Sequence, residues 1–99
     1  MLPLHLAFQE GFSGDTVIVQ VNGAEVARKV NLTSSLATAL AGTADVTVDK
    51  ESGNVQVTVP TKNLSASADI NFKKFPYLAI SVVRNSIQLT PSPEPFYYM

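Results

Sequence analysis

Apolar and polar residues alternate with a period of two along most of the chain, which is the pattern of β-strands with one buried face. The clearest stretch is TVIVQVNGAEVAR, residues 16–28, in which two alternating runs flank the pair Asn22-Gly23. Asn followed by Gly tolerates positive φ at both central positions of a two-residue turn. We therefore predict a hairpin, with Val21 opposite Ala24, Val19 opposite Val26 and Val17 opposite Arg28.

Two further pairs of alternating runs are joined by short turns. Residues 44–48 and 55–59 flank the loop Lys50–Gly53, and pairing Val48 with Val55 gathers their apolar side chains on one face. Residues 77–90 have Arg84-Asn85 at their centre, which sets Val82 opposite Ile87, Ile80 opposite Leu89 and Ser81 opposite Gln88. We predict hairpins at both places, because three registers that each collect the apolar side chains on one face support one another.

Two single strands are predicted at residues 2–8 and 64–72. Pro3 cannot donate to a ladder, so the first strand is expected at a sheet edge, at least where it begins. Ala66 and Ala68 indicate a tightly packed, central position for the other strand. Between these elements, residues 29–42 fit either one short helix, with Leu36 and Leu40 on one face, or a crossover loop.

About eight strands at intervals of roughly ten residues predict an all-β fold, two antiparallel sheets of about 7–8 strands packed face to face. The layout resembles immunoglobulin-like and transthyretin-like sandwiches in its architecture. The chain of 99 residues is long enough for one such domain without metal or disulfide help. We assign residues 1–90 to the domain and residues 91–99, PSPEPFYYM, to a tail whose alternating prolines favour an extended conformer.

Charge and cysteine content narrow the range of functions. Charged residues form 15% of the chain and the net charge is −1, so no basic stripe is present to bind nucleic acid. No apolar run reaches the roughly 18 residues that span a bilayer, and the first residues lack the pattern of a signal peptide. We therefore expect a cytoplasmic protein as the sequence is written, unless a leader has been removed, and no membrane partner. The absence of cysteine removes disulfides and thiolate nucleophiles.

Candidate catalytic and metal-binding residues are few. His5 is the one histidine, and the usual hydrolase triads would need it beside a serine, so we expect no enzyme and read His5 as a surface side chain. The loop around Asp49 and Glu51, with Asp45 on the same face, could offer oxygens to calcium. Lys50 lies among these carboxylates, so a solvated turn is favoured, and no cofactor is expected.

Aromatic residues supply the remaining candidates. Phe96, Tyr97 and Tyr98 either cover an open end of their own domain or form a contact surface for another subunit or partner. The first function that we predict is a non-enzymatic interaction or assembly module that self-associates as a homodimer. The alternative is a small carbohydrate-binding module that uses Phe12, Phe75 or Tyr77 as stacking surfaces, although Phe12 also fits as a plug over the end of the sandwich. The absence of tryptophan counts against this alternative.

Overall fold

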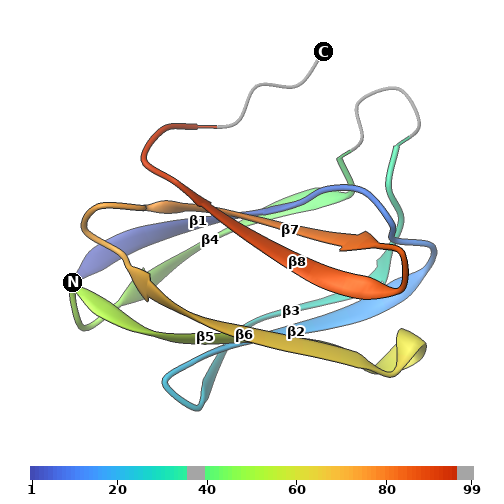
Figure 1. Cartoon of the computed structure of the whole chain (residues 1–99), viewed down its shortest axis with the longest axis horizontal. Coiled ribbons are helices and arrows are strands. Elements are labelled where there is room, and N and C mark those ends of the chain that lie inside the picture. The colour runs from blue at the N-terminus through green and yellow to red at the C-terminus, as the bar shows by residue number, and fades with distance from the viewer. Residues whose placement is uncertain (36–39, 96–99) are drawn as a thin grey trace.

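The computed structural model describes residues 1–35 and 40–95, which form two four-stranded β-sheets packed face to face (Figure 1). Sheet A has the strand order β4 (Gly42–Val48), β1 (Leu2–Phe8), β7 (Tyr77–Val83) and β8 (Ser86–Ser92). Sheet B has the order β3 (Ala24–Leu32), β2 (Asp15–Val21), β5 (Ser52–Val59) and β6 (Leu64–Asn71). One 3-10 turn, η1 (Pro60–Lys62), precedes β6. The predicted all-β sandwich is confirmed.

Alternate side chains of each strand point between the sheets and form a single core. The largest fully buried side chains are Phe8, Phe72, Leu4, Leu6, Leu78, Ile80, Val17, Val19, Val55, Val57 and Val59. Because successive residues of a strand face opposite sides of the sheet, this core follows directly from the alternation in the sequence.

One strand pair departs from the antiparallel arrangement that we predicted. β1 and β7 are parallel, with His5 opposite Tyr77 and Phe8 opposite Ile80. Within the described residues, every other strand pair is antiparallel. Parallel neighbours cannot be joined by a tight turn. No local turn signal in the sequence could therefore have indicated this pair.

The β7–β8 hairpin has the predicted register. Val82 lies opposite Ile87 and Ser81 opposite Gln88, and Arg84 and Asn85 hold positive φ values of 52° and 62° in the turn. The ladder continues to Ser92, which lies opposite Tyr77. It therefore extends two residues past the predicted limit at residue 90. Pro91 is tolerated there because β8 is an edge strand and needs no outward N–H group.

The β2–β3 hairpin has the predicted turn but not the predicted register beyond it. Val21 lies opposite Ala24 and Gln20 opposite Glu25, but Val19 then lies opposite Ala27 rather than Val26. The extra residue, Val26, is a β-bulge. It also brings Glu25 and Arg28 to one face, where Oε1 and Nη2 lie 2.8 Å apart.

The predicted hairpin at Lys50–Gly53 is wrong. β4 pairs with β1 in sheet A, whereas β5 pairs with β2 and β6 in sheet B, so the chain crosses from one sheet to the other between Val48 and Ser52. The valines of both strands still point into the core. A hairpin and a crossing between facing sheets bury the same side chains, so alternation alone could not separate them.

One predicted strand position is confirmed in part, and one is wrong. β1 lies inside sheet A, but β7 pairs with it only from His5 onward, so the start of β1 at Pro3 lies at an edge as predicted. β6 is an edge strand of sheet B rather than a central one. Cα atoms of β6 and β8 lie within 8 Å of each other across the two sheets, nearer than the usual spacing of about 10 Å. The small alanine side chains of β6 permit this close approach.

The segment that could be helix or loop is only partly described. β3 continues to Leu32, so residues 29–32 are strand, and β4 begins at Gly42. The central part of the segment, with Leu36, lies outside the described residues.

Candidate functional site

The outer face of sheet A carries a hollow of about 230 Å³. Its position follows from the sheet register, which sets outward-facing residues in rows across the four strands. One row contains Asp45, His5, Tyr77 and Ser92, and the next contains Thr43, Ala7, Ala79 and Thr90. Because the two alanine side chains are small, the surface of the sheet is depressed at the centre of the second row. Larger side chains surround this depression. The hollow is lined by His5, Leu6, Ala7, Thr43, Asp45, Tyr77 and Pro95.

His5 lies at the centre of the polar contacts in this hollow. Its Nδ1 is 2.7 Å from Oδ1 of Asp45, and its ring stacks on Tyr77 with centroids 4.8 Å apart and an interplanar angle of 22°. Both neighbours come directly from the register, because β4 and β7 flank β1. The imidazole is thus fixed by a carboxylate on one side and a phenol ring on the other.

The hollow brings a few polar groups into a mostly apolar lining. An activated nucleophile needs a hydroxyl or thiol hydrogen-bonded to the imidazole. Across residues 1–35 and 40–95, His5 has no such contact. The lining instead combines an aromatic ring, a carboxylate and the hydroxyl of Thr43.

The three aromatic residues predicted as stacking surfaces do not meet in one site. Phe12 is 4% exposed and packs edge-on against Phe8, with centroids 6.2 Å apart, so its ring belongs to the core at the end of the sandwich. Phe75 is half-buried, and Nζ of Lys74 lies 5.4 Å from its ring centroid. Of the three, Tyr77 lines the hollow. The predicted contact residues Phe96, Tyr97 and Tyr98 lie outside the described residues.

The acidic loop that we considered for calcium does not gather its carboxylates. Asp45 is bonded to His5, and Glu51 lies 3.8 Å from Nζ of Lys73. In the part of the chain that the structure describes, no group of three or more His, Cys, Asp or Glu residues could hold a metal ion.

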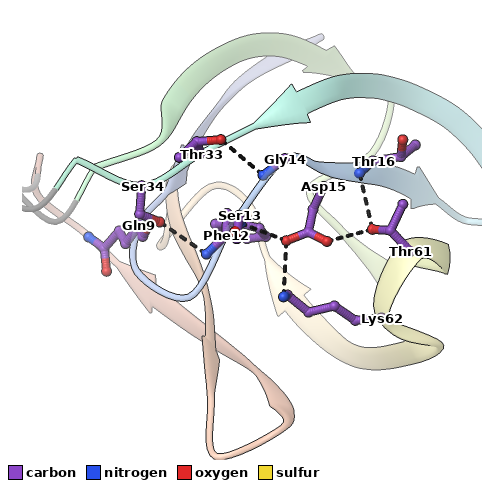
Figure 2. A network of polar contacts seen from close by, with 10 residues as sticks. All are labelled: Gln9, Phe12, Ser13, Gly14, Asp15, Thr16, Thr33, Ser34, Thr61 and Lys62. Carbon is purple, nitrogen blue, oxygen red and sulfur yellow. Dashed lines mark hydrogen bonds and ion pairs between the residues drawn. The ribbon is translucent and has the colours of Figure 1, made fainter.

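A polar network that sequence reasoning missed joins three loops at one end of the sandwich (Figure 2). The Asp15 carboxylate accepts hydrogen bonds from the hydroxyl of Thr61 at 2.6 Å and from the Ser13 amide at 2.8 Å, and it lies 3.2 Å from Nζ of Lys62. Asp15 is 3% exposed. Asp15 therefore anchors η1 to the start of β2. Its bond with Thr61 joins residues 46 positions apart, so no local sequence motif predicts it.

These bonds set the ionisation of Asp15. Burial raises the pKa of the Asp15 carboxyl, but the hydrogen bonds from Thr61, Ser13 and Lys62 outweigh burial and leave the pKa below its ordinary value. The carboxylate is thus held charged by its partners, as expected for a structural anchor.

The same end of the molecule is closed by a second set of bonds, from the β3–β4 connection. The Ser34 hydroxyl donates to the carbonyl of Gln9 and accepts from the Phe12 amide, and the Thr33 hydroxyl accepts from the Gly14 amide (Figure 2). The loop between β1 and β2 is therefore bonded to two other segments. Asp15 at its end connects it to η1, and Thr33 and Ser34 connect it to the β3–β4 connection.

The four edge strands differ in how they present their backbone. β3 has two register shifts, at Val26 and beside Asn31, which has a φ of +53°. β8 carries Pro91. β4 and β6 pair with their neighbours in an unbroken register. Bulges and prolines hinder the addition of a further strand, so β4 and β6 are the edges open to it.

The chain matches no protein-family model, no curated protein and no solved structure. No helix among the described residues is long and apolar enough to cross a membrane.

Proposed function

We propose that this protein is a non-enzymatic interaction or assembly module that self-associates through a sheet edge. The observation that carries the proposal is the difference among its edge strands. β3 is bulged and β8 contains proline, whereas β6 pairs with β5 from Leu64 to Asn71 without a shift. A straight edge of hydroxyl-bearing residues presents unpaired backbone groups, the template for a further strand.

The composition supports the same proposal. A net charge of −1 gives little repulsion between copies. The half-buried apolar side chains beside the β6 edge include Leu64 and Ala68, and the facing edge of sheet A adds Ile87 and Leu89. These side chains gain further burial when a second copy is present, which favours association.

Sedimentation of the purified chain over a wide range of concentration tests this proposal. We expect the apparent mass to rise from that of a monomer to that of a dimer with increasing concentration. A monomer at every concentration up to the solubility limit would refute self-association.

A second candidate function is binding of a small neutral sugar in the hollow of sheet A. The observation that favours it is the position of Tyr77, whose ring lines the hollow beside the carboxylate of Asp45 and the hydroxyl of Thr43. Aromatic rings stack on apolar sugar faces while nearby oxygens bond the hydroxyls.

A glycan array separates the two candidates. A sugar-binding module gives saturable binding as a monomer and loses it in Tyr77→Ala, whereas an assembly module gives no glycan signal. Phe75 is half-buried as Tyr77 is but does not line the hollow, so Phe75→Ala serves as the matched control.

A further inference from the structure

The sequence of β6 and the residues beside it is nearly the same in both directions. Residues 63–71 read NLSASADIN, so reversal about Ser67 exchanges Asn63 with Asn71, Leu64 with Ile70, Ser65 with Asp69 and Ala66 with Ala68. Each exchange joins side chains of similar or complementary kind. An edge strand of this type can pair antiparallel with its own copy across a two-fold axis.

The backbone of β6 has N–H and C=O groups at its outer edge in the positions that such pairing requires. The amide of Phe72 donates to the carbonyl of Glu51, so the N–H groups of even-numbered residues face β5. Because the ladder is regular, Ser65, Ser67 and Asp69 turn their N–H and C=O groups away from β5. No further strand pairs with β6 in the described part of the chain, so these groups face the edge.

We infer that two copies of this chain pair through β6, antiparallel, with the two-fold axis at Ser67. This inference rests on the proposed self-association and names its surface and register. Ser67 then lies opposite Ser67 of the second copy, and Ser65 lies opposite its Asp69. A serine hydroxyl donates to a carboxylate, so the two Ser65–Asp69 pairs are favourable, and the two Ser67 hydroxyls at the axis can hydrogen-bond to each other.

The other unbroken edge, β4, is a poorer surface for the same pairing. Its outward groups belong to Thr43, Asp45 and Thr47, because the amide of His5 donates to Pro76 and the even-numbered residues of β1 therefore face β4. A two-fold axis at the centre of β4 sets Asp45 opposite its own copy. Like charges directly opposite destabilise a strand pair, whereas the centre of β6 is an uncharged serine.

The side of the sandwich at β6 also has apolar surface to cover. Leu64 and Ala68 of β6 and Ile87 and Leu89 of β8 pack against the core but remain half-buried. β6 and β8 lie close together along this side (Figure 1). A second copy paired at β6 therefore extends the core as well as the ladder.

Single-cysteine variants test the register directly, because the chain contains no cysteine. In an antiparallel hydrogen-bonded pair the Cα atoms lie about 5.5 Å apart, within the range that a disulfide spans. We expect Ser67→Cys to form a disulfide-linked dimer under mild oxidation. Ser65→Cys is the matched control on the same strand and face, since four residues of offset, about 13 Å, separate it from its own copy. Asp45→Cys reports pairing through β4.

Lysine variants test the same axis without a covalent bond. Ser67→Lys sets two ammonium groups opposite each other and should raise the dimer dissociation constant about fivefold, whereas Ser65→Lys faces Asp69 and should lower it by a similar factor. Both residues are exposed, so both variants should melt as the parent protein does. The opposite signs distinguish the register from a general effect of charge.

The outcomes separate the inference from the proposed function. A dimer in which Ser67→Cys cross-links and Ser65→Cys does not supports the inference. A dimer in which Asp45→Cys cross-links, or in which neither Ser67→Cys nor Ser67→Lys has an effect, overturns the β6 axis and leaves self-association standing. A monomer at every concentration overturns both.

Discussion

The two edge strands of sheet B, β3 and β6, differ in almost every property that governs strand addition. β3 has two register shifts, at Val26 and beside Asn31, and it exposes the Glu25–Arg28 ion pair. β6 keeps one register over its whole length and exposes serines. Bulges increase local twist and remove donors from their regular spacing. One edge of this sheet is therefore closed to a further strand, and the other is open.

The comparison shows that protection against uncontrolled assembly can be unequal within one sheet. If both edges were open, copies could add at either side and form long arrays, because contacts between unlike surfaces do not close. A single open edge in sheet B with a self-complementary sequence would limit assembly through this sheet to a pair. Four experiments test how strongly the surrounding structure stabilises these two edge strands. They are given in order of decreasing expected effect.

The largest effect is expected from Val57→Asp, which removes the support of β6. Val57 is fully buried on β5, opposite Val19 of β2 and Ala66 of β6. An unpaired buried carboxylate costs several kcal/mol, comparable to the whole stability of a small domain. We expect no cooperative thermal transition by circular dichroism. Gln56→Asp, on the exposed face of the same strand, is the control and should fold. Cooperative melting of Val57→Asp would contradict the buried position.

Asp15→Asn should weaken both edges at once. Asp15 pairs with Leu32 at the end of β3 and bonds Thr61 and Lys62 just before β6. Loss of the charged acceptor should lower the free energy of unfolding by about 1–3 kcal/mol at pH 7, measured by urea denaturation.

The acid dependence of this variant has a defined sign. The folded pKa of Asp15 is lowered, so its contribution is complete above the unfolded pKa of about 3.9 and is lost as the pH falls through the folded pKa. Asp15→Asn should therefore lose less stability than the parent between pH 5 and pH 3. Asp49→Asn, which changes an exposed carboxylate after β4, is the control. If the free energy of unfolding changed with pH in the same way in the parent and in Asp15→Asn, Asp15 would not be the anchor.

Of the two edge strands of sheet B, Gly23→Ala should affect β3 and not β6, because Gly23 lies in the turn that joins β2 to β3. Gly23 has a φ of +85°, and an added Cβ would meet no atom within 4 Å, so the cost is conformational rather than steric. We expect the free energy of unfolding to fall by about 1 kcal/mol. Gly23→Asn, which tolerates positive φ, should cost less. An unchanged denaturation midpoint in Gly23→Ala would mean that the turn does not require this conformation.

Removal of residues 95–99 should have the smallest effect on either edge. The β8 ladder ends at Ser92, so the shortened chain should unfold within about 0.5 kcal/mol of the parent. We also expect its dimer dissociation constant to be unchanged, because the inferred axis lies at Ser67. A weaker dimer would instead assign the contact to the predicted aromatic residues Phe96–Tyr98, and loss of the cooperative melt would assign the tail to the core.

The sequence predicted which side chains face inward better than it predicted which strands pair. The β7–β8 hairpin and the crossing from β4 to β5 look alike in sequence, as two alternating runs joined by a short turn. Burial requires only that the valines face the core, and both pairing within a sheet and crossing between sheets satisfy this requirement. Arg84-Asn85 forms a tight turn with positive φ at both residues, whereas residues 49–51 connect the two sheets.

The candidate sites depended on contacts between distant residues, which limited their prediction. Tyr77 could be named from its aromatic ring, but its stacking on His5 requires the parallel pairing of β1 and β7. Asp15 could not be singled out, because its partners Thr61 and Lys62 reach it only after sheet B has formed. The symmetry of β6 was readable from residues 63–71, but its meaning depends on β6 being an edge.

The central position of β1 has a consequence for the time that the chain needs to fold. Leu2–Phe8 lies between β4 and β7, so this strand gains its second neighbour only when the residues from Tyr77 onward have joined the sheet. Contacts between residues so distant in the chain must close a large loop before they contribute, which places such folds in the millisecond-to-second range. Until then the apolar face of β1 is covered from one side only, and this interval is when we expect molecular chaperones to recognise the chain.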